Sequence, residues 1–204
     1  LLTDKARVLG LPAVVLTFEP HPREYFSPAD APARLASLRE KLLLLDAAGV
    51  DRAYVCRFDA RRAAQSAHAF IEDTLVRGLG VRHLYVGDDF CFGARRQGDF
   101  TMLQDAGKHY GFDVESMPTL GLHNERVSSS AVRDALASGD LAHAAHLLGR
   151  PYSIAGRVSH GDKIGRQLGF PTANIQMKHR RPALTGVYAV SVEGLAERRV
   201  ASVA

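Results

Sequence analysis

Residues 165–175, GRQLGFPTANI, combine side chains that can bind a phosphate group or a metal ion. In an extended chain Thr172 and Asn174 point to the same side, which places a hydroxyl beside a carboxamide oxygen. Mg²⁺ accepts such oxygen ligands together with phosphate oxygens and water. Glycines at three nearby positions would let a nucleotide approach the backbone without interference from a Cβ atom: Gly161, Gly165 and Gly169. The alternative is an ordinary turn, and the segment lacks the Gly-Lys-Ser/Thr of a Walker A loop.

Polar and aromatic residues also follow two apolar segments in the first half of the chain. AVVLTF leads into EPHP at residues 19–22, where a proline on each side of His21 restricts the backbone. HLYVG leads into DDFCFG, where Phe90 and Phe92 point to one face of an extended chain beside Asp89. Ligands of open α/β sheets bind beyond the carboxyl ends of the strands, so both segments are candidate sites. A rigid loop with an exposed histidine, and phenylalanines buried in the core, are the alternatives.

A third candidate is RVSSSAVRDAL at residues 126–136, where a serine can cap the start of a helix. We expect Arg133 to lie in the first turn of this helix, where its charge opposes the helix dipole. An anion bound by the free N–H groups and the serine hydroxyls would explain that placement. The alternative is a plain serine cap, with Arg133 offset by the neighbouring Asp134.

Two short predicted helices around residues 138–140 raise the possibility of a helix-turn-helix DNA reader. The chain carries a formal net charge of +4, which suits nucleic acid and small anions equally well. The second helix, DLAHAAHLLG, carries no Lys or Arg before Arg150. DNA binding is therefore the weaker interpretation.

A recurring pattern predicts the fold that positions these residues. A helical segment, a glycine, an apolar residue and an apolar strand follow one another four times, and the glycines are Gly10, Gly49, Gly80 and Gly111. Glycine just past a helix is the favoured left-handed stop. The intervening segments 35–48, 67–79 and 99–110 have helical periodicity, and the strands are continuous apolar runs. Alternating helices and strands of this kind predict an α/β fold with a doubly wound parallel sheet.

The apolar period changes from helical to alternating after Pro151, which predicts one domain over residues 1–149 and a second, all-β domain over residues 150–204. Residue 1 lies in a predicted helix and ASVA reads as a strand, so we expect further segments on both sides. No apolar run approaches a membrane span, no signal peptide opens the sequence, and the two cysteines lack metal-ligand spacing. We therefore expect a reduced, cytoplasmic protein.

In their order and spacing, TFEPHP, VGDDFCFG and RVSSSAVRDAL resemble the adenylyltransferase half of prokaryotic bifunctional riboflavin kinase/FAD synthetase. GRVSHGDKIGRQLGFPTANI, followed by GVYAV, resembles the start of the riboflavin kinase half. The resemblance implies a Rossmann-like nucleotidyltransferase domain followed by a truncated antiparallel β-barrel. It also implies that ATP phosphorylates riboflavin to FMN and that a second ATP, with Mg²⁺, converts FMN to FAD and pyrophosphate. No nucleic acid or membrane partner is implied.

The resemblance assigns roles to individual residues. The nucleotide and flavin site of the transferase half would be lined by Phe18, Pro20, His21, Pro22 and Phe26. Asp89 and Phe92 would contact the flavin, and Ser129 and Arg133 would hold phosphates. His21 and Arg133 are the catalytic candidates of this half. In the kinase half, Thr172 and Asn174 would act in catalysis and bind Mg²⁺, beside the three glycines named above.

Two expected family features are absent from the 204 residues. An HxGH motif, on a glycine-rich loop after the first strand, would lie just before residue 1, and a general-base glutamate of the kinase would lie beyond residue 204. We therefore expect this chain alone to bind ligands with little turnover. A relative with a single activity, and a flavin- or nucleotide-binding regulator without activity, are the alternatives.

Overall fold

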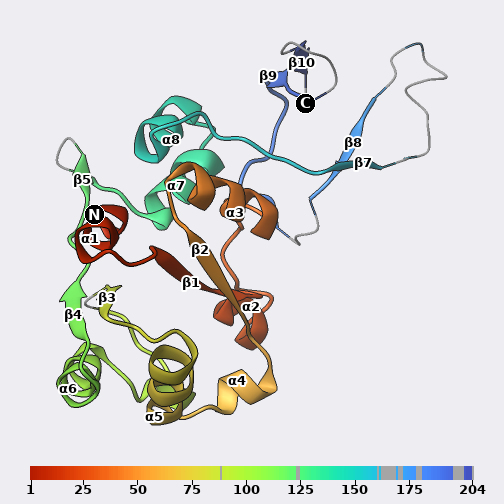
Figure 1. The fold of residues 1–204 in the computed structure, drawn as a ribbon. Helices are drawn as coiled ribbons and strands as arrows, with labels where there is room; N and C mark the ends of the chain where they lie inside the picture. The colour runs from red at the N-terminus through yellow and green to blue at the C-terminus, as the bar shows by residue number, and fades with distance from the viewer. Residues whose placement is uncertain are drawn as a thin grey trace. The chain divides into compact units, whose positions relative to one another are not determined.

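A computed structural model describes residues 1–87, 89–122, 125–159, 161, 169, 172–177, 181–194 and 200–203 (Figure 1). The chain divides into two units, and each is described by itself. Unit 1 comprises Leu1–Pro32 and Leu38–Leu120, and unit 2 comprises Ala33–Ser37 and Gly121–Ala204. Helices and strands are mixed, as the sequence predicts.

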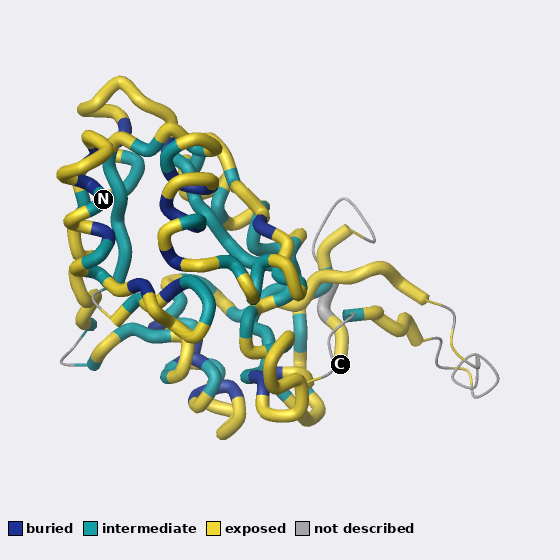
Figure 2. Tube along the Cα trace, turned by 90° about the horizontal axis from the view of Figure 1, so that it is seen from below, coloured by how far each residue is buried: buried dark blue, intermediate teal, exposed yellow. Residues whose placement is uncertain are grey.

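The four strands predicted for unit 1 are present and parallel. They are β1 (Val14–Glu19), β2 (Arg52–Arg57), β3 (His83–Val86) and β4 (Asp113–Ser116). β1 pairs with β2 from Val14↔Arg52 onward, and β3 pairs with β4 from His83↔Asp113 onward. In the described part of the chain these are two separate pairs, with no ladder between β1 and β3. All of β1 and β3 is therefore only half-buried, although the apolar runs predict burial on both faces (Figure 2).

Helices connect the strands of unit 1. They are α1 (Leu2–Leu9), α2 (Pro22–Phe26), α3 (Leu38–Ala47), α4 (Ala60–Ala64), α5 (Ala67–Ala69) continuing into the π-helical η1 (Phe70–Gly78), the 3₁₀ turn η2 (Ala94–Arg96) and α6 (Phe100–Tyr110). The predicted glycine stops are confirmed, because Gly10, Gly49, Gly80 and Gly111 all have positive φ. The N–H of the next residue bonds back into the helix, as from Leu11 to the Ala6 carbonyl at 2.9 Å.

The core of unit 1 lies between η1, α6 and the loop after β3. Its buried residues are Ala67, Phe70, Ile71, Leu75, Phe92 and Leu103. Phe18 of β1 reaches this cluster, with its ring centroid 6.4 Å from that of Phe70. Phe70 in turn lies 5.4 Å from Phe92. Phe92 in this core and Phe18 packed against it are therefore also residues that the sequence places at a candidate site.

Unit 2 contains a helix pair and three antiparallel strand pairs. The helices are α7 (Ser129–Ala137) and α8 (Leu141–Leu148), as predicted, and the strands are β5 (Gly121–Leu122), β6 (Glu125–Arg126), β7 (Arg157–Ser159), β8 (Asn174–Gln176), β9 (Ala189–Val192) and β10 (Val200–Val203). β5 pairs with β6, β7 with β8, and β9 with β10. Within the described ranges these pairs do not close into a barrel.

The strand that the sequence predicts from Tyr152 onward begins only at Arg157. Tyr152 packs instead against the core of the helix pair, whose buried residues are Val132, Ala135, Leu136, Ala144, Leu147 and Ala183. That contact explains the later start, because it holds Tyr152 on the helices. The predicted domain boundary at residues 149–150 falls within unit 2 and stays a prediction.

No helix in the described ranges is both long and apolar enough to cross a membrane. Cys56 and Cys91 are free thiols. Burial raises the pKa of Cys56 above its ordinary value.

The substitution Leu103→Ala tests the packing of unit 1. Leu103 is 0% exposed, so its truncation leaves a cavity and should lower the free energy of unfolding by about 2–5 kcal/mol. Urea unfolding followed by circular dichroism measures the change. Val8→Ala is the control, because Val8 is 83% exposed and the expected change is below about 0.5 kcal/mol. Equal losses for both variants would contradict this account of the core.

Candidate functional site

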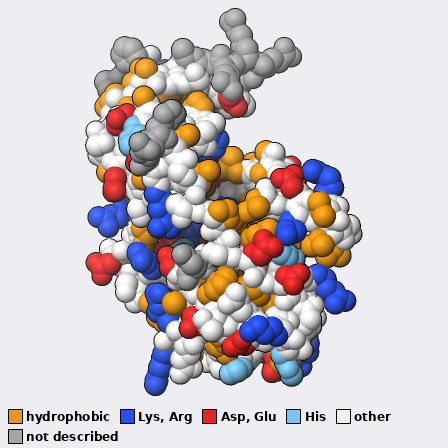
Figure 3. Space-filling view, turned by 90° about the vertical axis from the view of Figure 1, so that its left-hand side faces the viewer, with side chains coloured by type: hydrophobic (Ala, Val, Ile, Leu, Met, Phe, Trp, Pro, Cys, Tyr) orange, Lys and Arg blue, Asp and Glu red, His pale blue; other side chains and the backbone are white. Residues whose placement is uncertain are grey.

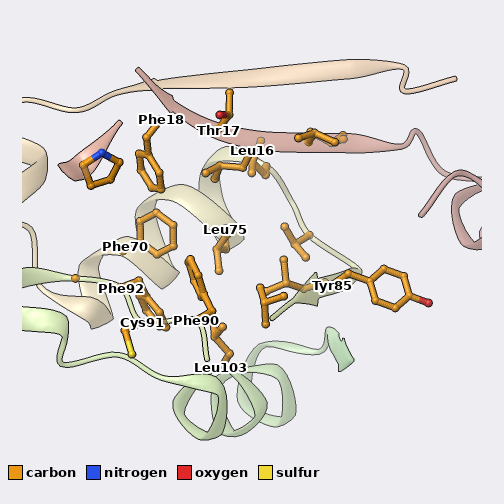
Figure 4. Close-up of a pocket in the computed structure, with 18 of the residues that line it drawn as sticks. Leu16, Thr17, Phe18, Phe70, Leu75, Tyr85, Phe90, Cys91, Phe92 and Leu103 are labelled. Atoms are coloured by element: carbon orange, nitrogen blue, oxygen red, sulfur yellow. The ribbon is translucent and has the colours of Figure 1, made fainter. Parts of the chain in front are cut away.

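A cavity of about 1310 Å³ lies in unit 1 between β1, β3 and the helices next to them. Most of its lining is apolar, and Figure 4 shows side chains from β1, η1 and the loop after β3 that point toward it. Five of the residues predicted for the transferase site line this cavity: Phe18, His21, Pro22, Phe26 and Phe92. The structure therefore brings together residues from two of the three candidate segments, the one after β1 and the one after β3.

Aromatic rings form one wall of the cavity. Phe90 and Phe92 stack with centroids 5.6 Å apart and an interplanar angle of 16°, as expected for side chains on one face. Phe92 is 6% exposed, so it belongs to the core as well as to the lining. Phe26 is 64% exposed and meets Phe58 edge to face at 5.6 Å. Phe58 is not among the predicted site residues, although it directly follows β2, another strand exit.

His21 caps the start of α2. Its Nδ1 accepts a hydrogen bond from the Arg23 N–H at 3.2 Å, and its own N–H donates to Glu24 Oε2 at 3.0 Å. Because Nδ1 accepts, the proton of the neutral imidazole is on Nε2. His21 is therefore held as a hydrogen-bond donor at the edge of the cavity. Pro20 precedes it through a cis peptide bond with Glu19.

The charged side chains that line the cavity are all basic among the described residues: Lys5, Arg23, Arg62, Arg82, Arg95 and Arg96. Arg95 and Arg96 have φ of 56° and 58°, directly after the loop of Phe92. In Figure 3 hydrophobic side chains lie next to Lys and Arg side chains on the face shown. An apolar, aromatic cavity with a basic rim suits a ligand with a flat ring system and anionic groups. Arg95 and Arg96 are not among the predicted site residues, although basic residues soon after the end of a strand can indicate an anion-binding site.

Lys5 is engaged by a carboxylate. Its Nζ lies 3.0 Å from Glu115 Oε1, and this hydrogen bond raises the pKa of Lys5 and lowers that of Glu115. Arg62 donates to Thr74 Oγ1 at 3.0 Å. Lys5 and Arg62 therefore already have partners within the protein. The candidate ligand-binding residues are mainly those near the carboxyl ends of β1 and β3.

Asp89 lies in the loop after β3, with an exposed side chain and outside the lining of the cavity. Its backbone carbonyl accepts a weak hydrogen bond from Cys91 Sγ at 3.7 Å. Phe92 thus lines the cavity and Asp89 does not, and their predicted contact with one flavin stays a prediction.

Ser129 and Arg133 lie on α7 in unit 2, where two details differ from the prediction. The cap is Ser128, whose Oγ accepts from the Ala131 N–H at 3.1 Å, and Ser129 is the first helical residue. The predicted placement of Arg133 in the first turn is wrong, because it is the fifth helical residue. Its Nε donates to the Ala33 carbonyl at 2.7 Å. The dipole argument for an anion therefore weakens, because the dipole effect is confined to the first turn.

The predicted magnesium ligands lie at the start of β8. Asn174 pairs with Ser159 of β7, Thr172 lies two residues earlier, and both side chains are exposed. Gly161 packs directly on the Asn174 carboxamide, and a Cβ at this position would overlap its nitrogen. Gly169 has φ of 82°, and Gly165 lies outside the described residues.

A hydroxyl and an amide oxygen suit Mg²⁺, and their exposure leaves room for phosphate oxygens and water as further ligands. The described residues contain no group of three or more His, Cys, Asp or Glu that could hold a metal ion. A magnesium site at Thr172 and Asn174 stays a prediction.

Comparison with known proteins identifies the family. The family model described as FAD synthetase matches residues 1–131, and the one described as riboflavin kinase matches residues 148–204. The bifunctional riboflavin kinase/FMN adenylyltransferase of Escherichia coli K12 is 51% identical over 203 residues, which are 100% of this chain and 65% of the relative. That of Pseudomonas fluorescens is 54% identical over 192 residues, or 94% of this chain and 61% of the relative.

A crystal structure described as a macrolide-efflux protein from Streptococcus pneumoniae has a TM-score of 0.75 and 27% identity, and covers 98% of this chain and 65% of that one. The chain thus spans less than two thirds of the length of these relatives. The FAD synthetase match extends over more than half of the 204 residues. This chain belongs to the FAD synthetase family.

Proposed function

We propose that this chain forms most of the binding apparatus of an enzyme that makes flavin cofactors. In this proposal ATP phosphorylates riboflavin to FMN, and a second ATP adenylylates FMN to FAD with release of pyrophosphate. The observation that carries the proposal is the cavity with a basic rim, whose aromatic residues Phe18, Phe26 and Phe92 lie at or after the carboxyl ends of β1 and β3. The two family matches, in the order adenylyltransferase then kinase, support it.

For adenylyl transfer, a phosphate oxygen of FMN attacks the α-phosphorus of ATP, and the bond to the departing pyrophosphate breaks. No covalent enzyme intermediate is required, so the protein has to align the two substrates and neutralise charge. In this proposal Phe18, Phe26 and Phe92 contact the flat rings of the substrates, and the arginines of the rim bind their phosphates. Ser129 and Arg133 are proposed to hold phosphates, and the exposed Asp89 is proposed to contact the flavin.

His21 can act in this step as a donor. The Nδ1 atom is occupied by the Arg23 N–H, so Nε2–H is the group that can face a phosphate oxygen. A neutral donor of this kind stabilises charge that develops during transfer without itself gaining a proton.

For riboflavin phosphorylation, a flavin hydroxyl oxygen attacks the γ-phosphorus of ATP, the bond to the departing ADP breaks, and the hydroxyl proton passes to a general base. Thr172 and Asn174 would hold Mg²⁺, with Gly161, Gly165 and Gly169 close to the nucleotide. When bound, Mg²⁺ would neutralise charge on the phosphate oxygens. The close approach of Gly161 to Asn174 supports this assignment, because a Cβ at residue 161 would overlap the Asn174 carboxamide.

The same proposal includes the architecture of the two domains. Residues 1–149 would form a doubly wound, Rossmann-like transferase domain, and residues 150–204 would begin an antiparallel β-barrel. The enzyme would act in the cytoplasm on riboflavin, FMN, FAD and ATP, without nucleic acid or membrane partners. A single-activity relative, or one that only binds flavin or nucleotide, is the alternative, and product analysis separates these cases.

The two activities should respond separately to substitution. In the longest form of the protein that the gene encodes, Thr172→Ala should lower FMN formation from riboflavin about 100-fold and spare FAD formation from FMN. Arg133→Ala should do the reverse. Chromatography of reactions with ATP and Mg²⁺ measures both products.

Arg133→Lys and thermal melting serve as controls, because Arg133 also bonds to the Ala33 carbonyl. Equal loss of both reactions in either alanine variant would refute the assignment. Persistence of unmodified riboflavin and FMN with the parent protein would refute the proposed function itself.

Two substitutions of His21 separate its capping role from a role toward substrate. Asn retains a side-chain acceptor for the cap, so His21→Asn should fold with the stability of the parent, whereas His21→Ala also loses the cap. If Nε2–H contacts a phosphate, both variants should lose about 10- to 100-fold in FAD formation. Parent activity in His21→Asn would show that the residue only caps α2.

Gly161→Ala tests the packing at the kinase motif. The added methyl group would displace the Asn174 carboxamide, so riboflavin phosphorylation should fall about tenfold or more while FAD formation from FMN continues. Gly121→Ala is the matched control, because the nearest atom to its Cβ is 3.9 Å away. Unchanged phosphorylation in Gly161→Ala would contradict the placement of Asn174 at the reacting groups.

A further inference from the structure

The loop after β3 contains a turn with an unusual backbone. Arg95 and Arg96, with φ of 56° and 58°, are the only residues other than glycine that have positive φ among those that the structure describes. This left-handed region is unfavourable for a residue with a Cβ atom, whereas glycine adopts it at no steric cost. Residues held in such conformations cluster at active and ligand-binding sites.

The surrounding structure fixes this turn. Phe92 and Gly98 form an antiparallel bridge at its base, with N···O distances of 3.0 and 2.9 Å. A Cβ atom at Gly98 would overlap the Phe92 ring, so the two residues are closely packed. The Ala94 N–H donates to the Gln65 carbonyl at 2.7 Å. The turn is therefore held both at its base and at its side, which keeps the unfavourable backbone in place.

Contacts within the protein do not account for the two arginine side chains. Both are exposed, and both line the cavity of unit 1. Neither forms an ion pair or a side-chain hydrogen bond with another residue in the described ranges. Two other cations of the cavity differ in this respect, because Lys5 is paired with a carboxylate and Arg62 with a buried hydroxyl.

The turn directly follows the stacked rings of Phe90 and Phe92, and residues 90–96 all line the cavity. A ligand with a flat ring on this aromatic pair would therefore have the turn next to it. Arginine suits phosphate as a partner, because its planar fork of N–H groups bonds two phosphate oxygens at once.

We propose that the turn of Arg95 and Arg96 makes the proposed flavin site selective for phosphorylated flavin, so that it takes FMN and discriminates against riboflavin. This inference rests on the proposed function, in which both flavins are present and only FMN is adenylylated. The two flavins share one ring system, so the aromatic rings alone do not separate them. The fixed backbone of the turn places both arginines before FMN binds, which reduces the entropy lost on binding.

Cys91 supplies a reporter within the same loop. It is exposed, whereas Cys56, the only other cysteine of the sequence, is 2% exposed. Iodoacetamide should therefore label Cys91 selectively, and a ligand on the neighbouring rings should slow this labelling, which mass spectrometry measures. Flavin bound in the proposed kinase half does not enter this readout, because Cys91 lies in unit 1.

In the 204-residue chain, FMN should protect Cys91 at a concentration about tenfold lower than riboflavin. Arg95→Gly and Arg96→Gly should each remove most of this preference by weakening protection by FMN, with protection by riboflavin unchanged. Both variants should also have a higher melting temperature than the parent, because glycine relieves the left-handed backbone. Arginines with only a structural role would not combine weaker FMN binding with higher stability.

Arg61→Ala is the matched control. It removes one exposed arginine that does not line the cavity, so the preference for FMN should stay. Added salt should weaken protection by FMN in the parent and leave protection by riboflavin unchanged.

Three results would overturn the proposal. Equal protection by FMN and riboflavin in the parent, or an unchanged preference in both glycine variants, would do so and leave the proposed function intact. An equal loss of preference in Arg61→Ala would assign the effect to the net charge of the protein. Absence of protection by either flavin would overturn this proposal and also the proposed placement of the flavin at Phe92.

Discussion

The contact of Phe70 with Phe18 and Phe92 holds unit 1 together. β1–β2 and β3–β4 share no backbone ladder in the part of the chain that is described, so side-chain packing has to connect them. The ring centroids of Phe18 and Phe70 lie 6.4 Å apart, and those of Phe70 and Phe92 lie 5.4 Å apart. These rings also line the cavity (Figure 4). The packing of unit 1 and the proposed ligand site therefore share these side chains, so a substitution of one of them should affect both.

Local signals in the sequence predict most of the elements. Each predicted helix of unit 1 that precedes a strand ends at a glycine with positive φ, because glycine adopts this conformation without a steric cost. The four apolar runs that follow are strands within one or two residues. Phe18, His21 and Phe92 could be predicted as neighbours because parallel strands bring their carboxyl ends to one edge.

The remaining features depend on contacts that no local pattern contains. Three consecutive serines leave the cap of α7 ambiguous, and the choice of Ser128 moves Arg133 out of the first turn. Tyr152 leaves its predicted strand because it packs on the helix pair. The left-handed conformation of Arg95 and Arg96 depends on the loop that contains Gly93, whose backbone lies against Ala67. These are tertiary effects, which override local propensity.

The short segment Ala33–Ser37 has a consequence for dissecting the protein. It belongs to unit 2, although the chain on both sides of it belongs to unit 1, so the polypeptide passes between the units three times. Ala33 and Leu35 pack against the core of the helix pair, and the Ala33 carbonyl binds Arg133. A single cleavage of the chain near residue 120 would therefore leave Ala33–Ser37, which belongs to unit 2, on the fragment that holds unit 1. The boundary between the two contact units therefore does not coincide with the boundary between the two family matches, because the helix pair that Ala33–Ser37 packs on lies almost entirely before residue 148.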